Sequence, residues 1–156
     1  MDIEAMINSV RDFLDGDDWN YDFESENNLI RTGINLDCKL NSINEVIAFS
    51  DAGFQVYAMI KLDADEETRP KVMEYITRAN YGLRLGNFEL DLEDGEVRYK
   101  VYTNTKGMTE LPQEIVEDAI IVPAMMFDRY GDGLATLMMG FSDPATEIEK
   151  AEQDDE

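Results

Sequence analysis

The side chains that could do chemistry in this chain are mostly carboxylates. The sequence has 35 acidic residues against 13 lysines and arginines, and it contains no histidine. Histidine is the most frequent general base, nucleophile activator and neutral metal ligand, so the usual starting points for catalysis are missing. The sequence also lacks phosphate-binding loops, dinucleotide fingerprints and nucleophile elbows. We therefore expect no catalytic residues, no cofactor and no enzymatic activity.

Two acidic clusters remain as candidates for binding a hard cation. The first follows the ligand spacing of a calcium loop and consists of Asp63, Asp65, Glu67 and Glu74. Thr68 stands where such a loop requires glycine, so the match fails where its geometry is strictest. We expect no calcium site there.

The second cluster gathers Asp91, Glu93, Asp94 and Glu96 on one predicted hairpin. These carboxylates could hold a cation weakly. The Asp94-Gly95 pair is equally well explained by the chemistry of a tight turn. A carboxylate-based metal-binding or small-molecule-binding domain is therefore the alternative function for this chain.

The net charge of −22 narrows the classes of partner. Nucleic acids and anionic membranes bind to basic patches, so we expect neither. Such acidity keeps a protein soluble and speeds its encounter with a basic protein or peptide. No stretch approaches the ~20 apolar residues of a membrane span, and the N-terminus lacks a basic signal-peptide start, so we expect a cytoplasmic protein. Cys38, the single cysteine, is expected to be a small buried hydrophobe.

Helical and strand periods alternate along the first half of the chain. Residues 3–14 carry apolar side chains at helical spacing, with Asp2 as a suitable N-cap. Trp19, Tyr21 and Phe23 indicate a short edge strand. Three further strands have the two-residue period of a half-buried sheet: 30–38, 45–49 and 54–60. The last of these is apolar on both faces, which places it inside the sheet.

The second half of the chain repeats the pattern. A helix is predicted to open in the acidic stretch from residue 63 and to end before Gly86, and a hairpin follows over residues 88–101. The last helix opens at Leu111-Pro112 and is apolar nearly all round from 115 to 127.

Its later part contains residues that should disturb it. Pro123 is expected to kink this helix, and Gly131 and Gly133 are expected to interrupt it. We interpret the nearby Asp128 and Asp132 as helix-end residues rather than metal ligands.

This order, α-β-β-β-α-β-β-α, predicts an α+β fold in which helices flank an antiparallel sheet. We expect one domain over residues 1–140 and an acidic, disordered tail over 141–156.

Methionines and aromatic residues gather in the last helix at Met125, Met126, Phe127 and Tyr130. Methionine-rich surfaces adapt to irregular partners, so these four residues are candidates for a partner or dimer interface. The alternative is that they fill the core.

Turn motifs in the second half of the chain point to a family. They are Asn80-Tyr81-Gly82, the run from Gly86 to Asp91, Asp94-Gly95-Glu96 leading into Val97-Arg98-Tyr99, and Leu111-Pro112. With these motifs, residues from about 54 to 139 resemble the YbjN-like family, a group of proposed bacterial sensory transduction regulators. The resemblance implies a type III secretion chaperone-like fold, typical of small, acidic, usually dimeric proteins that bind extended partner segments. We therefore expect a non-catalytic, chaperone-like or regulatory homodimer that binds a protein or peptide client.

Overall fold

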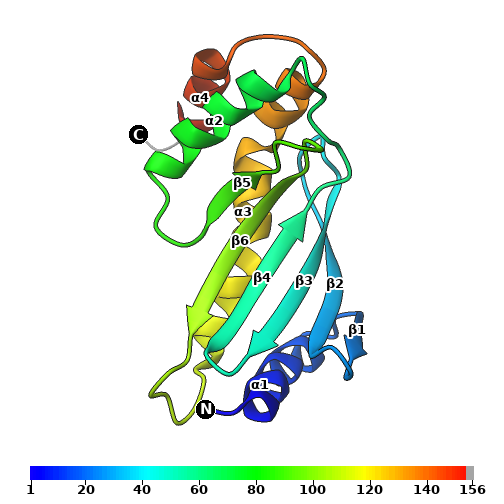
Figure 1. The fold of residues 1–156 in the computed structure, drawn as a ribbon, viewed down its shortest axis with the longest axis vertical. Coiled ribbons are helices and arrows are strands. Elements are labelled where there is room, and N and C mark those ends of the chain that lie inside the picture. Colours follow the sequence, from blue (N-terminus) through cyan, green and yellow to red (C-terminus); the bar gives the residue numbers. More distant parts are fainter. Residues whose placement is uncertain (154–156) are drawn as a thin grey trace.

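The computed structural model describes residues 1–153, which form four helices and one six-stranded antiparallel sheet (Figure 1). The strand order across the sheet is β1-β2-β3-β4-β6-β5. This confirms the α+β class, the short edge strand and the interior position of β4. The elements in chain order are α1 (Ile3–Gly16), β1 (Tyr21–Glu24), β2 (Leu29–Asn35), β3 (Ser42–Ser50), β4 (Gly53–Met59), α2 (Arg69–Tyr81), β5 (Asn87–Leu90), β6 (Val97–Asn104), α3 (Gln113–Met138) and α4 (Pro144–Glu152).

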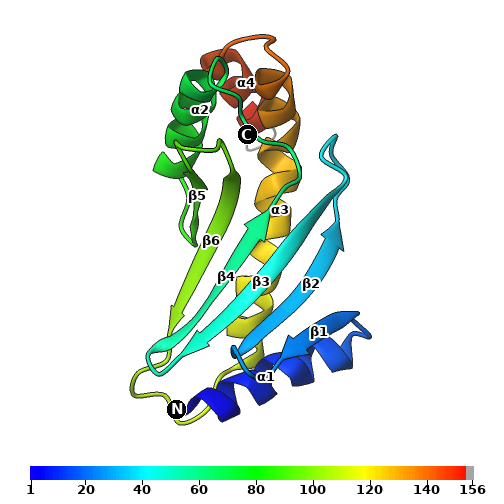
Figure 2. The ribbon, with the colours of Figure 1, turned by 45° about the vertical axis from the view of Figure 1, so that its right-hand side comes forward.

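The helices cover one face of the sheet only. Helix α3 runs along this face behind β4 and β6, and α1 crosses its lower end (Figures 1 and 2). Helices α2 and α4 pack together at the upper end of α3, and α2 also contacts β5. Within residues 1–153 no helix covers the opposite face. We call the covered side the inner face and the uncovered side the open face.

Strand alternation explains the core. Ile47, Val56 and Val101 stand opposite one another on β3, β4 and β6, and all three are buried on the inner face. Their chain neighbours point the other way and keep part of their surface exposed. The two-residue period seen in the sequence is therefore the period of burial in the structure.

The glycines of α3 correct one expectation. The helix runs without interruption from 113 to 138 and contains Gly131 and Gly133. A Cβ at Gly131 would lie 2.6 Å from Cys38 Sγ, and one at Gly133 would collide with the Tyr75 hydroxyl. The prediction of a break was wrong because these glycines admit neighbouring side chains close to the helix.

Asp128 and Asp132 also differ from expectation, since they lie within α3 rather than at its end. Their carboxylates accept hydrogen bonds from the backbone N–H groups of Asp37 and Lys39, at 2.7 and 2.8 Å. They thus hold the loop between β2 and β3 against α3. Cys38, in the same loop, is half-buried rather than fully buried.

Helix α2 begins at Arg69, later than the predicted start near residue 63. The Asp65 side chain accepts a hydrogen bond from the Thr68 backbone N–H at 2.8 Å, which forms a turn in place of the first helical turns. The acidic stretch that was expected to open the helix is therefore a loop, closed by this turn just before α2 begins.

The expected disordered tail is wrong for residues 144–152, which form α4. Asp143 caps this helix by accepting a hydrogen bond from the Thr146 N–H at 3.0 Å, and the Tyr130 hydroxyl donates to Glu152 at 2.9 Å. Residues 154–156 of that tail lie outside the described residues. Among the helices that the structure describes, none combines the length and apolar character of a membrane span.

Candidate functional site

The four residues expected at an interface do not share one surface. Phe127 is 0% exposed and Tyr130 is 2% exposed, and both pack edge-on against Phe88 with ring centroids 5.3 and 5.7 Å away. Met125 is 55% exposed and Met126 is half-buried. Successive residues point about 100° apart around a helix, so adjacency in sequence does not put them on one side. Phe127 and Tyr130 therefore belong to the interior of the chain.

The acidic hairpin uses two of its carboxylates to build its own turn. Asp91 accepts a hydrogen bond from the Glu93 N–H at 2.8 Å, and Asp94 accepts one from the Glu96 N–H at 2.9 Å. Gly95, at φ +81°, presses against the Ala64 carbonyl, where a Cβ would collide. In the part of the chain that the structure describes, no three Asp, Glu, Cys or His side chains come together as a metal site.

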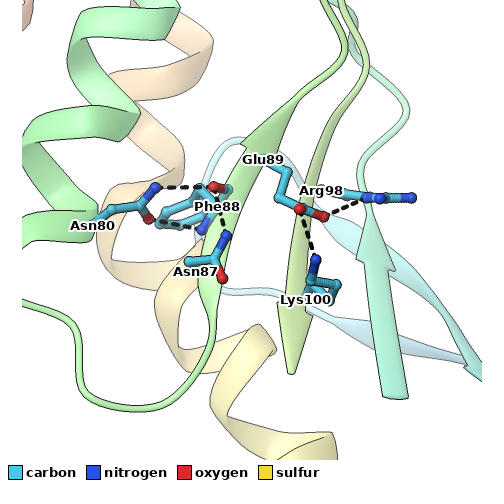
Figure 3. Close-up of polar contacts among 6 residues, drawn as sticks. All are labelled: Asn80, Asn87, Phe88, Glu89, Arg98 and Lys100. Atoms are coloured by element: carbon cyan, nitrogen blue, oxygen red, sulfur yellow. Dashed lines mark hydrogen bonds and ion pairs between the residues drawn. The ribbon is translucent and has the colours of Figure 1, made fainter. Parts of the chain in front are cut away.

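Asn80, from the helix-end motif, positions strand β5. Its side chain accepts a hydrogen bond from the Phe88 backbone N–H at 2.8 Å and donates one to the Phe88 carbonyl at 2.9 Å (Figure 3). This pair replaces the backbone partner that an edge strand lacks. Phe88 is thereby fixed toward the core, and Glu89 must point to the open face.

The open face consists of two neighbouring cross-strand rows. Arg31, Val46, Tyr57 and Lys100 stand opposite one another in the first row, across β2, β3, β4 and β6. The second row contains Gly33, Asn44, Met59, Arg98 and Glu89. The middle of both rows is half-buried and apolar at Val46, Tyr57 and Met59. Strands with apolar residues on both faces are usually covered on both.

A depression of about 720 Å³ lies over the β1 side of this face. Arg31, Asn44, Val46 and Met59 line it, so both rows contribute side chains. The carboxyl ligands and nucleophiles of a reaction centre do not converge there among the described residues.

A charged cluster occupies the opposite end of the rows. Glu89 accepts hydrogen bonds from Arg98 Nε at 2.8 Å and from Lys100 Nζ at 2.9 Å (Figure 3). The Arg98 guanidinium also lies 4.5 Å from the centroid of the Tyr57 ring. Partial burial acts to raise the pKa of Glu89, but the bonds from Lys100 and Arg98 and their charges outweigh it and hold that pKa below its usual value.

Glu45 lies between residues that line the depression, yet its side chain points away from the open face. Strand alternation directs it to the inner face beside Ile43 and Ile47. It is 1% exposed, and neither carboxyl oxygen has a hydrogen-bond partner within the described chain. Burial raises the pKa of Glu45 well above its ordinary value.

Sequence reasoning did not identify Arg31, Val46 and Arg98 as a shared surface. One signal was available, because Tyr57 and Met59 make the outer side of β4 apolar. The cross-strand pairing needed to connect them follows from the register, which the sequence alone does not specify.

No protein-family model matches this chain, and no curated protein matches it either.

Proposed function

We propose that this protein is a non-catalytic, chaperone-like or regulatory module that binds a protein or peptide partner on its open face. The observation that carries the proposal is the apolar centre formed by Val46, Tyr57 and Met59 on a face without a covering helix in residues 1–153. An exposed apolar patch with polar residues around it marks interaction sites in soluble proteins. The depression beside this centre offers space for a side chain of the partner.

The resemblance to the YbjN-like family supports the same proposal. A chaperone-like member would be cytoplasmic, would act as a homodimer and would hold a segment of a client protein. The net charge of −22 favours encounter with a client that is basic overall. Of the residues first considered for an interface, Met125 and Met126 remain available to a second copy, because they are exposed and half-buried.

Affinity capture with matched variants tests the proposal. Met59→Asp places a charge in the apolar centre, and Met73→Asp makes the same change at a 45%-exposed methionine on α2. A partner should be retained by the wild-type protein and by Met73→Asp, and lost from Met59→Asp. Circular dichroism and thermal melting establish that both variants are folded.

Equal retention by all three proteins would contradict a binding role for the open face. Sedimentation velocity on the same variants addresses the homodimer. A monomer at micromolar concentration would contradict self-association but not client binding.

A further inference from the structure

The two edges of the sheet differ in how far their backbone is engaged. At the β5 edge, the Asn80 side chain bonds both the N–H and the carbonyl of Phe88. At the opposite edge, β1 pairs with β2 over residues 29–32 only, while β2 continues to Asn35 and pairs with β3 along its whole length. Residues 33–35 of β2 therefore border no strand of the described chain on their outer side (Figure 2). We call them the free end of β2.

Two hydrogen bonds show which way the backbone of β2 points. The Phe49 N–H donates to the Asn28 carbonyl at 3.2 Å, and the Leu36 N–H donates to the Asn41 carbonyl at 2.7 Å. Alternate residues of a strand in an antiparallel ladder bond to the same neighbour. The even-numbered residues of β2 therefore bond toward β3, and the odd-numbered ones direct their N–H and C=O groups outward.

Gly33 and Asn35 are the odd-numbered residues beyond the end of β1. Asn20, which precedes β1, contacts β2 through the Thr32 hydroxyl, which donates to the Asn20 carbonyl at 2.8 Å. Asn35 is exposed, and its backbone N–H and C=O have no hydrogen-bond partner in the described chain. An unpaired strand edge of this kind is a template for another extended chain.

The edge formed by β1 is protected in comparison. This strand has four residues, and short edge strands discourage pairing with other chains. Arg11 of α1 donates to the Tyr21 hydroxyl at 3.3 Å, and its guanidinium lies 5.1 Å from the centroid of the Phe23 ring. These contacts bind β1 to α1, which lies beside it (Figure 2).

The depression on the open face lies beside the free end of β2. Gly33, Asn44 and Met59 line it, and Gly33 has no side chain to fill it. Residues directly opposite one another on paired strands point to the same face. A residue paired with Gly33 would therefore extend its side chain over the depression, and the next residue would meet half-buried Ile34 on the inner face.

We infer that the partner is held as an extended segment that adds a strand to the free end of β2, in line with β1, with an apolar side chain against Ile34. An extended polypeptide repeats its backbone donors and acceptors every two residues, about 7 Å, which is the spacing of Gly33 and Asn35. Backbone pairing supplies affinity in such complexes, and sites for alternate side chains supply specificity. The inference rests on the proposed function and gives the conformation and place of the segment.

Amide hydrogen exchange of the free protein, followed by NMR, tests the starting point. The Ile34 N–H is bonded within the sheet, so it should exchange slowly. The Asn35 N–H should exchange about 10-fold faster or more. Equal protection of the two amides would show that the free end of β2 is already paired in solution, and it would overturn the inference.

Binding is tested with a random 12-residue peptide library displayed on phage and selected on the wild-type protein. Enriched peptides are synthesised, and their dissociation constants are measured by fluorescence anisotropy on the wild-type protein, Asn35→Pro and Asn35→Ala. Proline removes the outward N–H and leaves the bonds to β3, whereas alanine keeps this N–H and is the matched control. Asn35→Pro should weaken binding by about 10-fold or more, and Asn35→Ala should leave it unchanged.

Methylation of the peptide backbone tests the inference without any variant of the protein. In an added strand, alternate peptide N–H groups face β2 and the others face solvent. N-methylation should therefore weaken binding at every second position and be tolerated between them. If Asn35→Pro does not fold, this scan and the exchange measurement decide. Absence of the two-residue period, or equal affinity for wild type and folded Asn35→Pro, would overturn the inference.

Met59→Asp separates the inference from the proposed function. Peptides lost from Met59→Asp but indifferent to Asn35→Pro and to methylation would overturn the added strand and leave the open face as the binding surface. Peptides bound equally by all of these proteins would overturn both. If Asn35→Pro changes the sedimentation coefficient of the protein, a second copy occupies the free end of β2, and the inference of a separate partner segment fails.

Discussion

The inner and open faces of the sheet are made by the same strands, but they have different relations to the rest of the chain. On the inner face, Ile47, Val56 and Val101 are buried beneath helices. On the open face, Val46 and Tyr57, next to them in sequence, are half-buried with no helix above them in residues 1–153. The inner face is part of a core that the helices of the same chain complete. The open face has an apolar centre, formed by Val46, Tyr57 and Met59, that has no cover within residues 1–153.

This difference indicates where stability and function reside. Substitutions on the inner face should act on the free energy of unfolding, because they remove contacts made within the chain. Substitutions on the open face should act on binding and leave folding almost unchanged. Equal effects of substitutions on both faces would contradict the distinction.

Phe88→Ala should give the largest effect. Phe88 packs edge-on against Tyr99 at 4.8 Å between ring centroids and also contacts Phe127 and Tyr130. Removing the ring should lower the free energy of unfolding by about 3–5 kcal/mol, measured by urea titration. The adjacent Asn87→Ala, on the open side, should cost much less. A loss below 1 kcal/mol for Phe88→Ala would show that these rings do not form a packed cluster.

Ile47→Ala and Val46→Ala form the closest test, since the two residues are neighbours on β3. Ile47 is 0% exposed, so its truncation should cost about 2–5 kcal/mol in the same urea titration. Val46 is half-buried beside the depression, so its truncation should cost less and should weaken partner binding. The reverse ranking would mean that the open face carries the more important packing.

Glu45→Met should stabilise the protein, because Glu45 is a polar residue on the inner face. Its buried carboxyl has no hydrogen-bond partner among the described residues, and an apolar side chain of similar size removes that penalty. At pH 7 the free energy of unfolding should rise by about 1–3 kcal/mol.

The pH dependence of this gain has a defined sign. The pKa of Glu45 is raised in the folded protein, so the folded state binds its proton more strongly than the unfolded chain does. The wild-type protein therefore loses stability as pH rises above about 4.3, the ordinary glutamate value, until the folded pKa is passed. The part of the Glu45→Met advantage that comes from ionisation should disappear near pH 4, which leaves the smaller cost of the unpaired neutral carboxyl. An equal advantage at pH 4 and pH 7 would show that the pKa of Glu45 is not raised on folding.

Period-two alternation was sufficient to predict the strands and most of the core, because it is a local property of the sequence. The failure inside α3 depends on distant neighbours. Gly131 and Gly133 indicate a helix break unless Cys38 and Tyr75 are known to pack against them. Asp143 offered a local signal for α4, as an N-cap before Pro144, but the acidic composition of the tail concealed it.

The candidate site was harder to predict than the fold. Arg31, Tyr57 and Lys100 are far apart in sequence and meet only through the pairing of β2, β3, β4 and β6.

Glu89→Gln should give the smallest change in stability and the clearest separation of the faces. Glu89 holds Arg98 and Lys100 on the open face, and partly exposed ion pairs contribute about 0.2–1 kcal/mol. Because the pKa of Glu89 is lowered on folding, this contribution is complete above the unfolded value near 4.3 and is lost as pH falls through the folded pKa. Urea titrations of the two proteins should therefore differ at pH 7 and converge once the pH is below the folded pKa of Glu89. In binding, the substitution releases Arg98 from the position that Glu89 fixes beside Tyr57, so attachment of a partner to the open face should weaken. Unchanged attachment would show that the position of Arg98 does not matter for binding.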